Sequence, residues 1–169
     1  MRKLYLIFLF FSFQTVFCQD QGKIKAIDSL VSRINSSDLG TATDTVINDM
    51  PAMGLYMKTL VSVTIQDSGV VKYRNDVFGI TDRGGRRDTL HVITTFYFVN
   101  GKLAKVEDYG IAEGGRSVKA DWYYYNDQPL YYNAGEIKGE KAELRSKQLL
   151  FMAGMMQEQF RKRLPGNSR

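Results

Sequence analysis

Histidine and cysteine are scarce in this chain, and that scarcity limits the chemistry it can perform. The 169 residues contain one histidine, His91, and one cysteine, Cys18. A zinc site built from histidine and cysteine needs several such ligands, so we expect no metal site of that kind and no cofactor. General acid–base catalysis by His91 needs a carboxylate or hydroxyl partner, and no spacing in the sequence supplies one. We therefore interpret His91 as a half-exposed strand residue.

Acidic residues in the central region are the candidates for a pair of catalytic carboxylates, as in glycoside hydrolysis. They are Glu107, Asp108, Glu113 and Asp121. Neighbouring residues of a strand point to opposite faces, so Glu107 and Asp108 do not converge on one substrate. We interpret all four as solvated charges, and we predict no catalytic residue.

Two glycine-rich loops that carry arginines are the first candidate binding sites. They read Arg83-Gly84-Gly85-Arg86-Arg87 and Gly114-Gly115-Arg116. Glycines let backbone N–H groups approach an anion, and arginines add bidentate donors. The spacing matches no Walker or dinucleotide-binding fingerprint. We expect Arg83, Arg86, Arg87 and Arg116 to contact an anionic ligand or a partner, and a pair of flexible soluble loops is the alternative.

A dense group of aromatic residues is the second candidate binding site. Its centre is the run Trp122-Tyr123-Tyr124-Tyr125. Alternate residues of a strand face opposite sides, so half of this run lies away from the core unless another element covers it. Exposed aromatic rings favour contact with carbohydrate, peptide or protein. Trp122 and Tyr124 are therefore the candidate contact residues, and ordinary strand packing is the alternative.

The elements that position these residues are hairpins. Phe96-Tyr97-Phe98-Val99 runs into Asn100-Gly101, the pair that a type I′ hairpin turn favours. Five further runs rich in β-branched and aromatic residues, bounded by turn signals, predict strands. Residues 36–52 are the least periodic and predict a long loop, in which Val46-Ile47 is a candidate short edge strand.

Apolar residues at helical spacing predict two helices. Residues 23–34 give a short amphipathic helix, and residues 138–164 give a longer one that Pro165-Gly166 ends. The predicted fold class is α+β: a curved antiparallel sheet of about six strands, a meander of hairpins, packed on the C-terminal helix. The nearest general shape is a cystatin-like or NTF2-like cone, offered as an analogy.

The first 18 residues predict a secretory signal peptide. A basic start, Met1-Arg2-Lys3, precedes the apolar run Leu4 to Phe13, which at about 10 residues is half of the ~20 that a membrane span needs. Cleavage after Cys18 would leave residues 19–169 as a single domain without a transmembrane helix. A lipid anchor on Cys18 is the alternative. Neither case leaves a thiol for a disulfide in the domain.

Loss of Arg2 and Lys3 lowers the net charge from +5 to about +3, too weak to imply nucleic acid. We therefore expect a secreted or periplasmic, non-enzymatic binding module whose partner is a protein, a peptide or a small anionic or carbohydrate ligand. The alternative is a small NTF2-like enzyme or ligand carrier with a pocket inside the sheet cone, where His91 or Asp121 would supply the polar group. A membrane-tethered lipoprotein is a further alternative.

Overall fold

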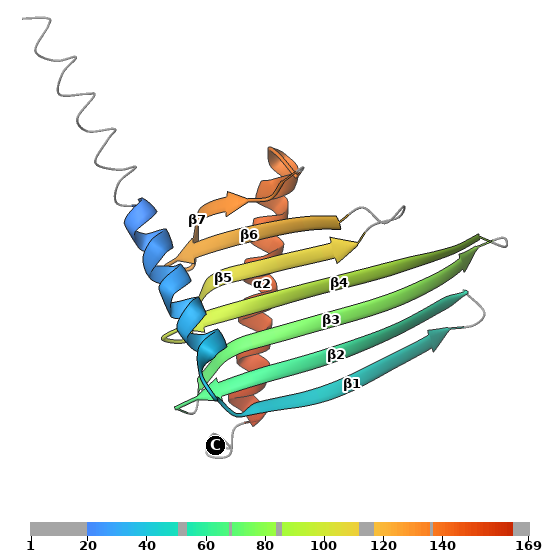
Figure 1. Ribbon diagram of the computed structural model, residues 1–169, viewed down its shortest axis with the longest axis horizontal. Coiled ribbons are helices and arrows are strands. Elements are labelled where there is room, and N and C mark those ends of the chain that lie inside the picture. Colours follow the sequence, from blue (N-terminus) through green and yellow to red (C-terminus); the bar gives the residue numbers. More distant parts are fainter. Residues whose placement is uncertain are drawn as a thin grey trace, which may run out of the picture. The chain divides into compact units, whose positions relative to one another are not determined.

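Seven antiparallel strands followed by one long helix make up most of the protein in its computed structural model (Figure 1). The strands are β1 (Thr41–Met50), β2 (Leu55–Gln66), β3 (Gly69–Arg83), β4 (Arg86–Val99), β5 (Lys102–Ile111), β6 (Ser117–Tyr125) and β7 (Gln128–Asn133). Helix α2 spans Glu140–Arg163. The strand order in the sheet is the sequence order, so the sheet is a meander. The predicted α+β class and curved antiparallel sheet are confirmed, with seven strands in place of about six.

The structure describes residues 20–50, 54–67, 69–83, 86–111, 117–135 and 137–163. The chain divides into two compact units, Met1–Ser36 and Ser37–Arg169. In the first unit, residues 20–36 form a helix that includes the predicted helix of residues 23–34. The predicted signal peptide, residues 1–18, lies outside the described residues. The second unit holds the sheet and α2, and the prediction of a single domain over residues 19–169 stays a prediction.

Strand β1 replaces much of the loop that the sequence predicts over residues 36–52. All ten residues from Thr41 to Met50 pair with β2, so the loop prediction is wrong for residues 41–50. Val46 and Ile47 lie inside this strand, which forms one edge of the sheet. The segment is rich in threonine and has weak hydrophobic periodicity. Its backbone is ordered by pairing with β2 rather than by burial of an apolar face.

Two hairpin turns have the backbone that their sequences favour. Asn100 and Gly101 have φ angles of 51° and 71°, and Asn126 and Asp127 have φ angles of 52° and 60°. A type I′ turn needs φ > 0 at both central residues, and asparagine, aspartate and glycine tolerate that region best. The predicted Asn-Gly turn is confirmed, and the second hairpin uses the same geometry with Asp127 in the glycine position.

The two faces of the sheet differ in what they contact. We call the face that packs on α2 the helix face and the other the opposite face. The buried cluster of the helix face comes from β4, β5, β6, the residue after β7, and α2: Phe96, Phe98, Leu103, Val106, Ala120, Trp122, Tyr124, Ala134, Ala142, Leu149 and Ala153. Directly paired residues of antiparallel strands share a face. The strand register therefore assigns each of the remaining sheet residues to the helix face or the opposite face.

Helix α2 begins with acidic residues and buries small ones. Glu140 and Glu143 lie in its first turn, where negative charge favours the helix dipole. Ala142, Leu149 and Ala153 point to the sheet with exposures of 0%, 0% and 3%. Figure 1 shows α2 running across the strands on one face, with strands β1 to β6 continuing past it toward the β3–β4 tip. These outer halves of the strands leave both sheet faces free of α2.

Candidate functional site

The strands that flank the two arginine loops have their loop-side ends at the same end of the sheet. Arg83 ends β3, Arg86 starts β4, and the two are register partners, as are Asp82 and Arg87. Because β3 and β5 run in the same direction in the meander, the connections β3–β4 and β5–β6 leave the sheet at the same end. The side chains of residues 83–87, and the whole of Arg116, lie outside the described residues. Their binding role stays a prediction.

Trp122 and Tyr124 are core residues of the helix face. Each is 1% exposed. The Trp122 ring lies 5.3 Å from the Tyr132 ring, and its Nε1–H has no partner among the described residues. Both side chains therefore pack against α2. Contact of either side chain with a ligand stays a prediction.

Tyr124 also links the sheet to α2 by hydrogen bonds. Its hydroxyl donates to the Ser146 carbonyl at 3.1 Å and accepts from the Ser146 hydroxyl at 3.2 Å. Burial raises the pKa of Tyr124 to about 12, so the phenol stays protonated at neutral pH. The tyrosine is thus a structural tie between β6 and α2.

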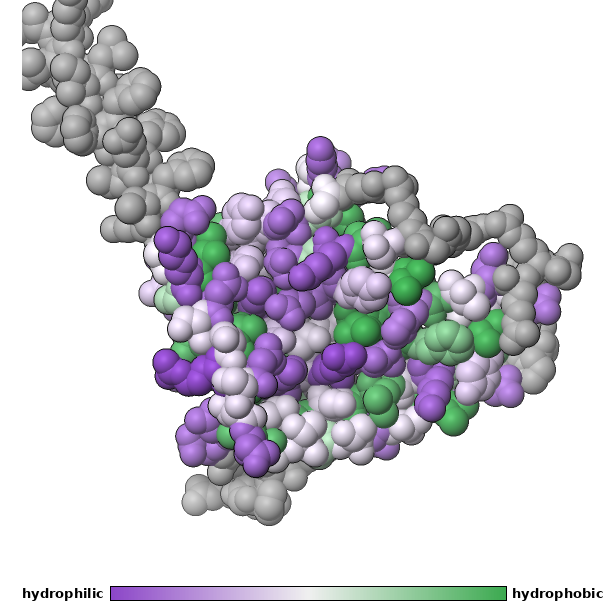
Figure 2. Space-filling view, in the orientation of Figure 1, coloured by the Kyte–Doolittle hydropathy of each residue, from purple (hydrophilic) through white to green (hydrophobic). Residues whose placement is uncertain are grey.

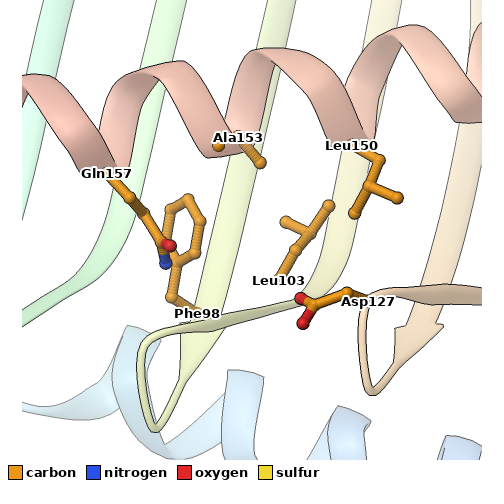
Figure 3. A pocket seen from close by; sticks show the side chains of 7 residues that line it. Phe98, Leu103, Asp127, Leu150, Ala153 and Gln157 are labelled. Atoms are coloured by element: carbon orange, nitrogen blue, oxygen red, sulfur yellow. The ribbon is translucent and has the colours of Figure 1, made fainter.

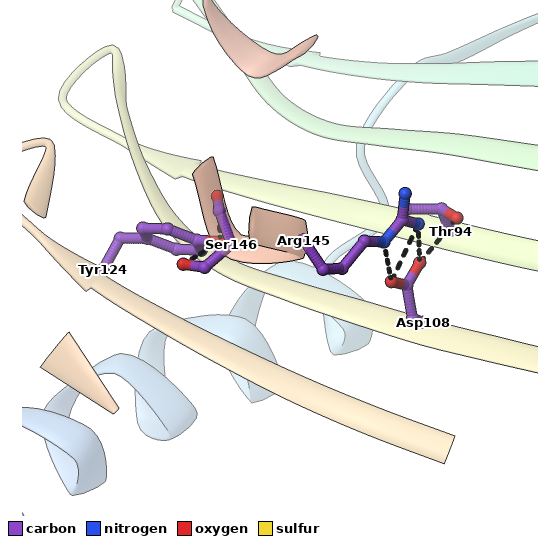
Figure 4. A network of polar contacts seen from close by, with 5 residues as sticks. All are labelled: Thr94, Asp108, Tyr124, Arg145 and Ser146. Atoms are coloured by element: carbon purple, nitrogen blue, oxygen red, sulfur yellow. Dashed lines mark hydrogen bonds and ion pairs between the residues drawn. The ribbon is translucent and has the colours of Figure 1, made fainter. Parts of the chain in front are cut away.

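A second polar contact to α2 comes from Asp108 (Figure 4). Both Nε and Nη2 of Arg145 donate to the Asp108 carboxylate, at 3.2 Å and 3.0 Å to Oδ2. The Thr94 hydroxyl donates to the same carboxylate at 2.7 Å. Asp108 is therefore an anchor for the helix. Its neighbour Glu107 points to the other face, as the sequence predicts, so the two do not form a catalytic pair.

Two lysines and three tyrosines form one row of the opposite face. The register places Lys72, Tyr97, Lys105, Tyr123 and Tyr131 side by side across five strands. The Lys72 ammonium lies 5.7 Å from the Tyr97 ring centre, and the Lys105 ammonium lies 5.0 Å from that of Tyr123. Such cation–π contacts stabilise a lysine that is taken out of water. This row is the aromatic stretch that faces away from α2.

The two carboxylates of the next row sit beside a lysine. Lys105 Nζ lies 3.1 Å from Glu107 Oε1 and 3.9 Å from Asp121 Oδ1. The Tyr97 hydroxyl donates to Glu107 at 3.1 Å. Both carboxylates are thus within ion-pair distance of the same ammonium. The arrangement supports an ion-pair network rather than glycoside chemistry.

His91 has the carboxylate partner that the sequence did not reveal. Its Nε2 lies 2.8 Å from Asp76 Oδ1, and Arg74 lies 3.1 Å from the other carboxylate oxygen. Burial alone would raise the pKa of Asp76, but the hydrogen bonds from His91 and Arg74 outweigh it and lower that pKa. Phe78 packs edge-on against the imidazole, with ring centres 6.5 Å apart. The register of the β3–β4 hairpin is the signal that would have found this contact.

His91 and Asp121 are not brought together. The two lie on the opposite face but in different rows: His91 pairs with Phe78 and Ile111, whereas Asp121 pairs with Glu107 and Asn133. The interior between the sheet and α2 therefore contains neither of them. A pocket enzyme built on these two residues has no support from their arrangement.

A small pocket opens beside α2, next to two hairpin turns (Figure 3). It has a volume of about 210 Å³ and is lined by Phe98, Leu103, Asp127, Leu150, Ala153, Gly154 and Gln157. Gln157 Nε2 donates to the Gly101 carbonyl at 2.6 Å and so fixes one wall. Asp127 at the rim lies 3.6 Å from Lys102 Nζ. The space fits one apolar side chain or ring, below the usual size of a cofactor site.

Metal and membrane features can be judged for the described part of the chain. No group of three or more histidine, cysteine or acidic residues there is arranged to hold a metal ion. Likewise, neither of the helices formed by described residues combines the length and the apolar character that crossing a membrane requires. No protein-family model, curated protein or solved structure matches this chain.

Proposed function

We propose that this protein is an exported, non-enzymatic binding module whose contact surface is the outer half of the opposite face. The observation that supports this proposal best is that the opposite face exposes large apolar side chains. Ile47, Leu60, Phe78 and Tyr109 are 58%, 36%, 40% and 37% exposed. One face of an antiparallel sheet commonly meets water with polar side chains, and the helix face already supplies the apolar one. Figure 2 views this side, with apolar patches set among polar ones.

Strands β3 and β4 depart from simple alternation in these outer halves. The runs Val77-Phe78-Gly79-Ile80 and Leu90-His91-Val92-Ile93 place apolar residues on both faces. A strand with this pattern is usually buried on both sides. Here Phe78, on the opposite face, is 40% exposed, so the pattern favours a surface that a partner covers. An apolar patch with a polar rim is the usual form of a protein contact site.

The polar residues of the same face give the contact its orientation. The His91–Asp76–Arg74 cluster lies among the apolar side chains and offers directional hydrogen bonds at its exposed edges. The β3–β4 tip, with Arg83, Arg86 and Arg87 in the sequence, ends this surface. Arginines at a rim favour acidic groups on the partner. A polypeptide with apolar anchors and nearby acidic residues fits this combination best.

A photo-crosslinking amino acid at position 78 tests the contact in the cells that produce the protein. We expect one discrete adduct from position 78 and none from Tyr125, a matched aromatic site that is 50% exposed in the β6–β7 hairpin. Unchanged emission from Trp122 would show that both variants fold. Leu60, on the same face, is a second site for the crosslinking amino acid. Absence of an adduct from both position 78 and position 60 in folded protein would refute the proposal.

Export is also part of the proposal. The predicted signal peptide, residues 1–18, lies outside the described residues. An intact-mass measurement on the purified protein tests export. A mass that starts at Gln19 supports a cleaved secreted or periplasmic form, and a lipid mass on Cys18 that Cys18→Ser removes supports the tethered form. A mass that still includes residues 1–18 would contradict export by this leader.

A further inference from the structure

The outward side of α2 carries a stripe of exposed apolar residues. Leu144, Phe151 and Met155 are 59%, 67% and 45% exposed. Successive helix residues turn by about 100°, so spacings of seven and four residues keep these three on one side. That side is opposite Ala142 and Leu149, which meet the sheet at 0% exposure. A helix that is apolar on both sides is normally covered on both.

The helix face of the sheet has an uncovered apolar region beside α2. The region begins beyond the strand row that contains Asp108, the residue bound by Arg145. It is formed by Val46, Met57, Val77, Leu90, Val92 and Val118. Leu90 and Val46 are 46% and 45% exposed. Gly79 and Gly110 lie between them and add no side chain, so the surface is flat enough for a helix. We call this region the valine floor.

We propose that a second copy of this chain covers both surfaces, with the α2 stripe of each copy packed on the valine floor of the other. The stripe is on the side of α2 that faces away from the sheet, and the floor is the sheet surface beside α2. A two-fold axis parallel to α2 then places the two helices side by side between two sheets. Such an interface is isologous, so one operation covers all four surfaces.

The dimensions of the two surfaces agree. Leu144 to Met155 spans eleven residues of α2, or about 16 Å at ~1.5 Å per residue. The strands from β3 to β6 span three spacings of ~4.8 Å, or about 14 Å. The stripe is therefore as long as the row Val77, Val92, Gly110 and Val118 is wide.

The area indicates a modest dimer. Each helix footprint is about 16 Å by ~10 Å, and each copy contributes one helix and one floor, which gives roughly 320 Å² of flat contact before the seam between the helices. Stable interfaces bury about 800 Å² of accessible surface per partner, and side-chain relief makes accessible area larger than flat area. We expect a concentration-dependent dimer at the weaker end of specific complexes. This inference uses the helix face and is independent of the proposed function.

Two charge variants, alone and mixed, test the dimer by sedimentation velocity on the purified protein. Phe151→Asp places an acid in the stripe, and Leu90→Lys places a base in the floor. In a homodimer of either variant, a charge meets an apolar surface at both contacts. In the mixed dimer, one contact joins the acid to the base and the other is wild type. Tyr125→Asp, at an exposed site of the β6–β7 hairpin, is the matched control.

We expect the wild type and Tyr125→Asp to dimerise with rising concentration, each stripe or floor variant to sediment as a monomer, and the equimolar mixture to recover the dimer. Unchanged Trp122 emission identifies folded variants. A wild type that stays monomeric across the micromolar range would overturn the inference. A dimer that survives Phe151→Asp, or a mixture that stays monomeric, would overturn it as well.

Discussion

Replacing Trp122 tests whether the helix face is the core of the protein. The side chain is 1% exposed and lies in the cluster that includes Phe96 and Val106. Truncating a buried tryptophan to alanine costs about 3–5 kcal/mol, a large part of the roughly 5–15 kcal/mol that stabilises a domain. For a chain of this size each kcal/mol shifts Tm by about 2–4 °C. We therefore expect Trp122→Ala to lower Tm by about 6–20 °C.

Trp122→Phe separates packing from the indole N–H. The buried Nε1–H has no partner in the part of the chain that the structure describes, and an unsatisfied buried donor costs about 1–3 kcal/mol. Phenylalanine removes that donor and keeps a ring in the core, so it should cost less than half as much as alanine. Urea unfolding followed by far-ultraviolet circular dichroism gives both free energies, since the variants lack the only tryptophan. A loss below about 1 kcal/mol in Trp122→Ala would refute the assignment of this residue to the core.

Three further predictions concern titration and backbone strain. The folded pKa of Tyr124, about 12, exceeds the unfolded value of 10.0, so stability should be complete below pH 10 and fall by about 2–3 kcal/mol toward pH 12. Absorbance at 295 nm should show this phenol ionising last, and Tyr124→Phe should remove that step. The folded pKa of Asp76 lies below 3.8, so its stabilisation is present above that pH and is lost as pH falls through the folded pKa. Asp76→Asn should therefore flatten the acid limb of urea-unfolding free energies, and parallel curves would contradict the His91 contact. A Cβ at Gly54 would lie 2.1 Å from the Asp82 carbonyl oxygen, whereas one at Gly101 meets nothing within 4 Å, although both have positive φ. Gly101→Ala should cost about 1–2 kcal/mol and Gly54→Ala clearly more, and equal losses of Tm would be inconsistent with that close approach.

Local signals explain which parts of the fold the sequence predicts. The Asn100-Gly101 turn follows from residue types alone, because few residues adopt φ > 0 at two successive positions. The C-terminal helix follows from its apolar spacing, and the prediction of residues 138–164 agrees with Glu140–Arg163 over the described residues. The sequence does not predict strand β1, because pairing with β2 orders its backbone and no local pattern in Thr41–Met50 indicates that pairing.

The site was harder to predict because it depends on register and on which face α2 covers. The sequence correctly places alternate members of the run Trp122 to Tyr125 on opposite faces, but it cannot say which of them face α2. Tyr123 lies on the opposite face, while Trp122 and Tyr124 pack under α2. The His91–Asp76 contact joins residues 15 positions apart, and only the register of β3 and β4 brings them within 2.8 Å.

Native mass spectrometry of the protein taken from the cells that produce it tests the binding-module proposal most directly. We expect a complex with a polypeptide of different mass, which Phe78→Ser loses and Tyr125→Ser keeps. Exposed apolar residues carry little stability, so both variants should remain folded. A wild-type protein found without another polypeptide, or carrying only a small molecule below about a kilodalton, would contradict the proposal and favour the small pocket beside α2.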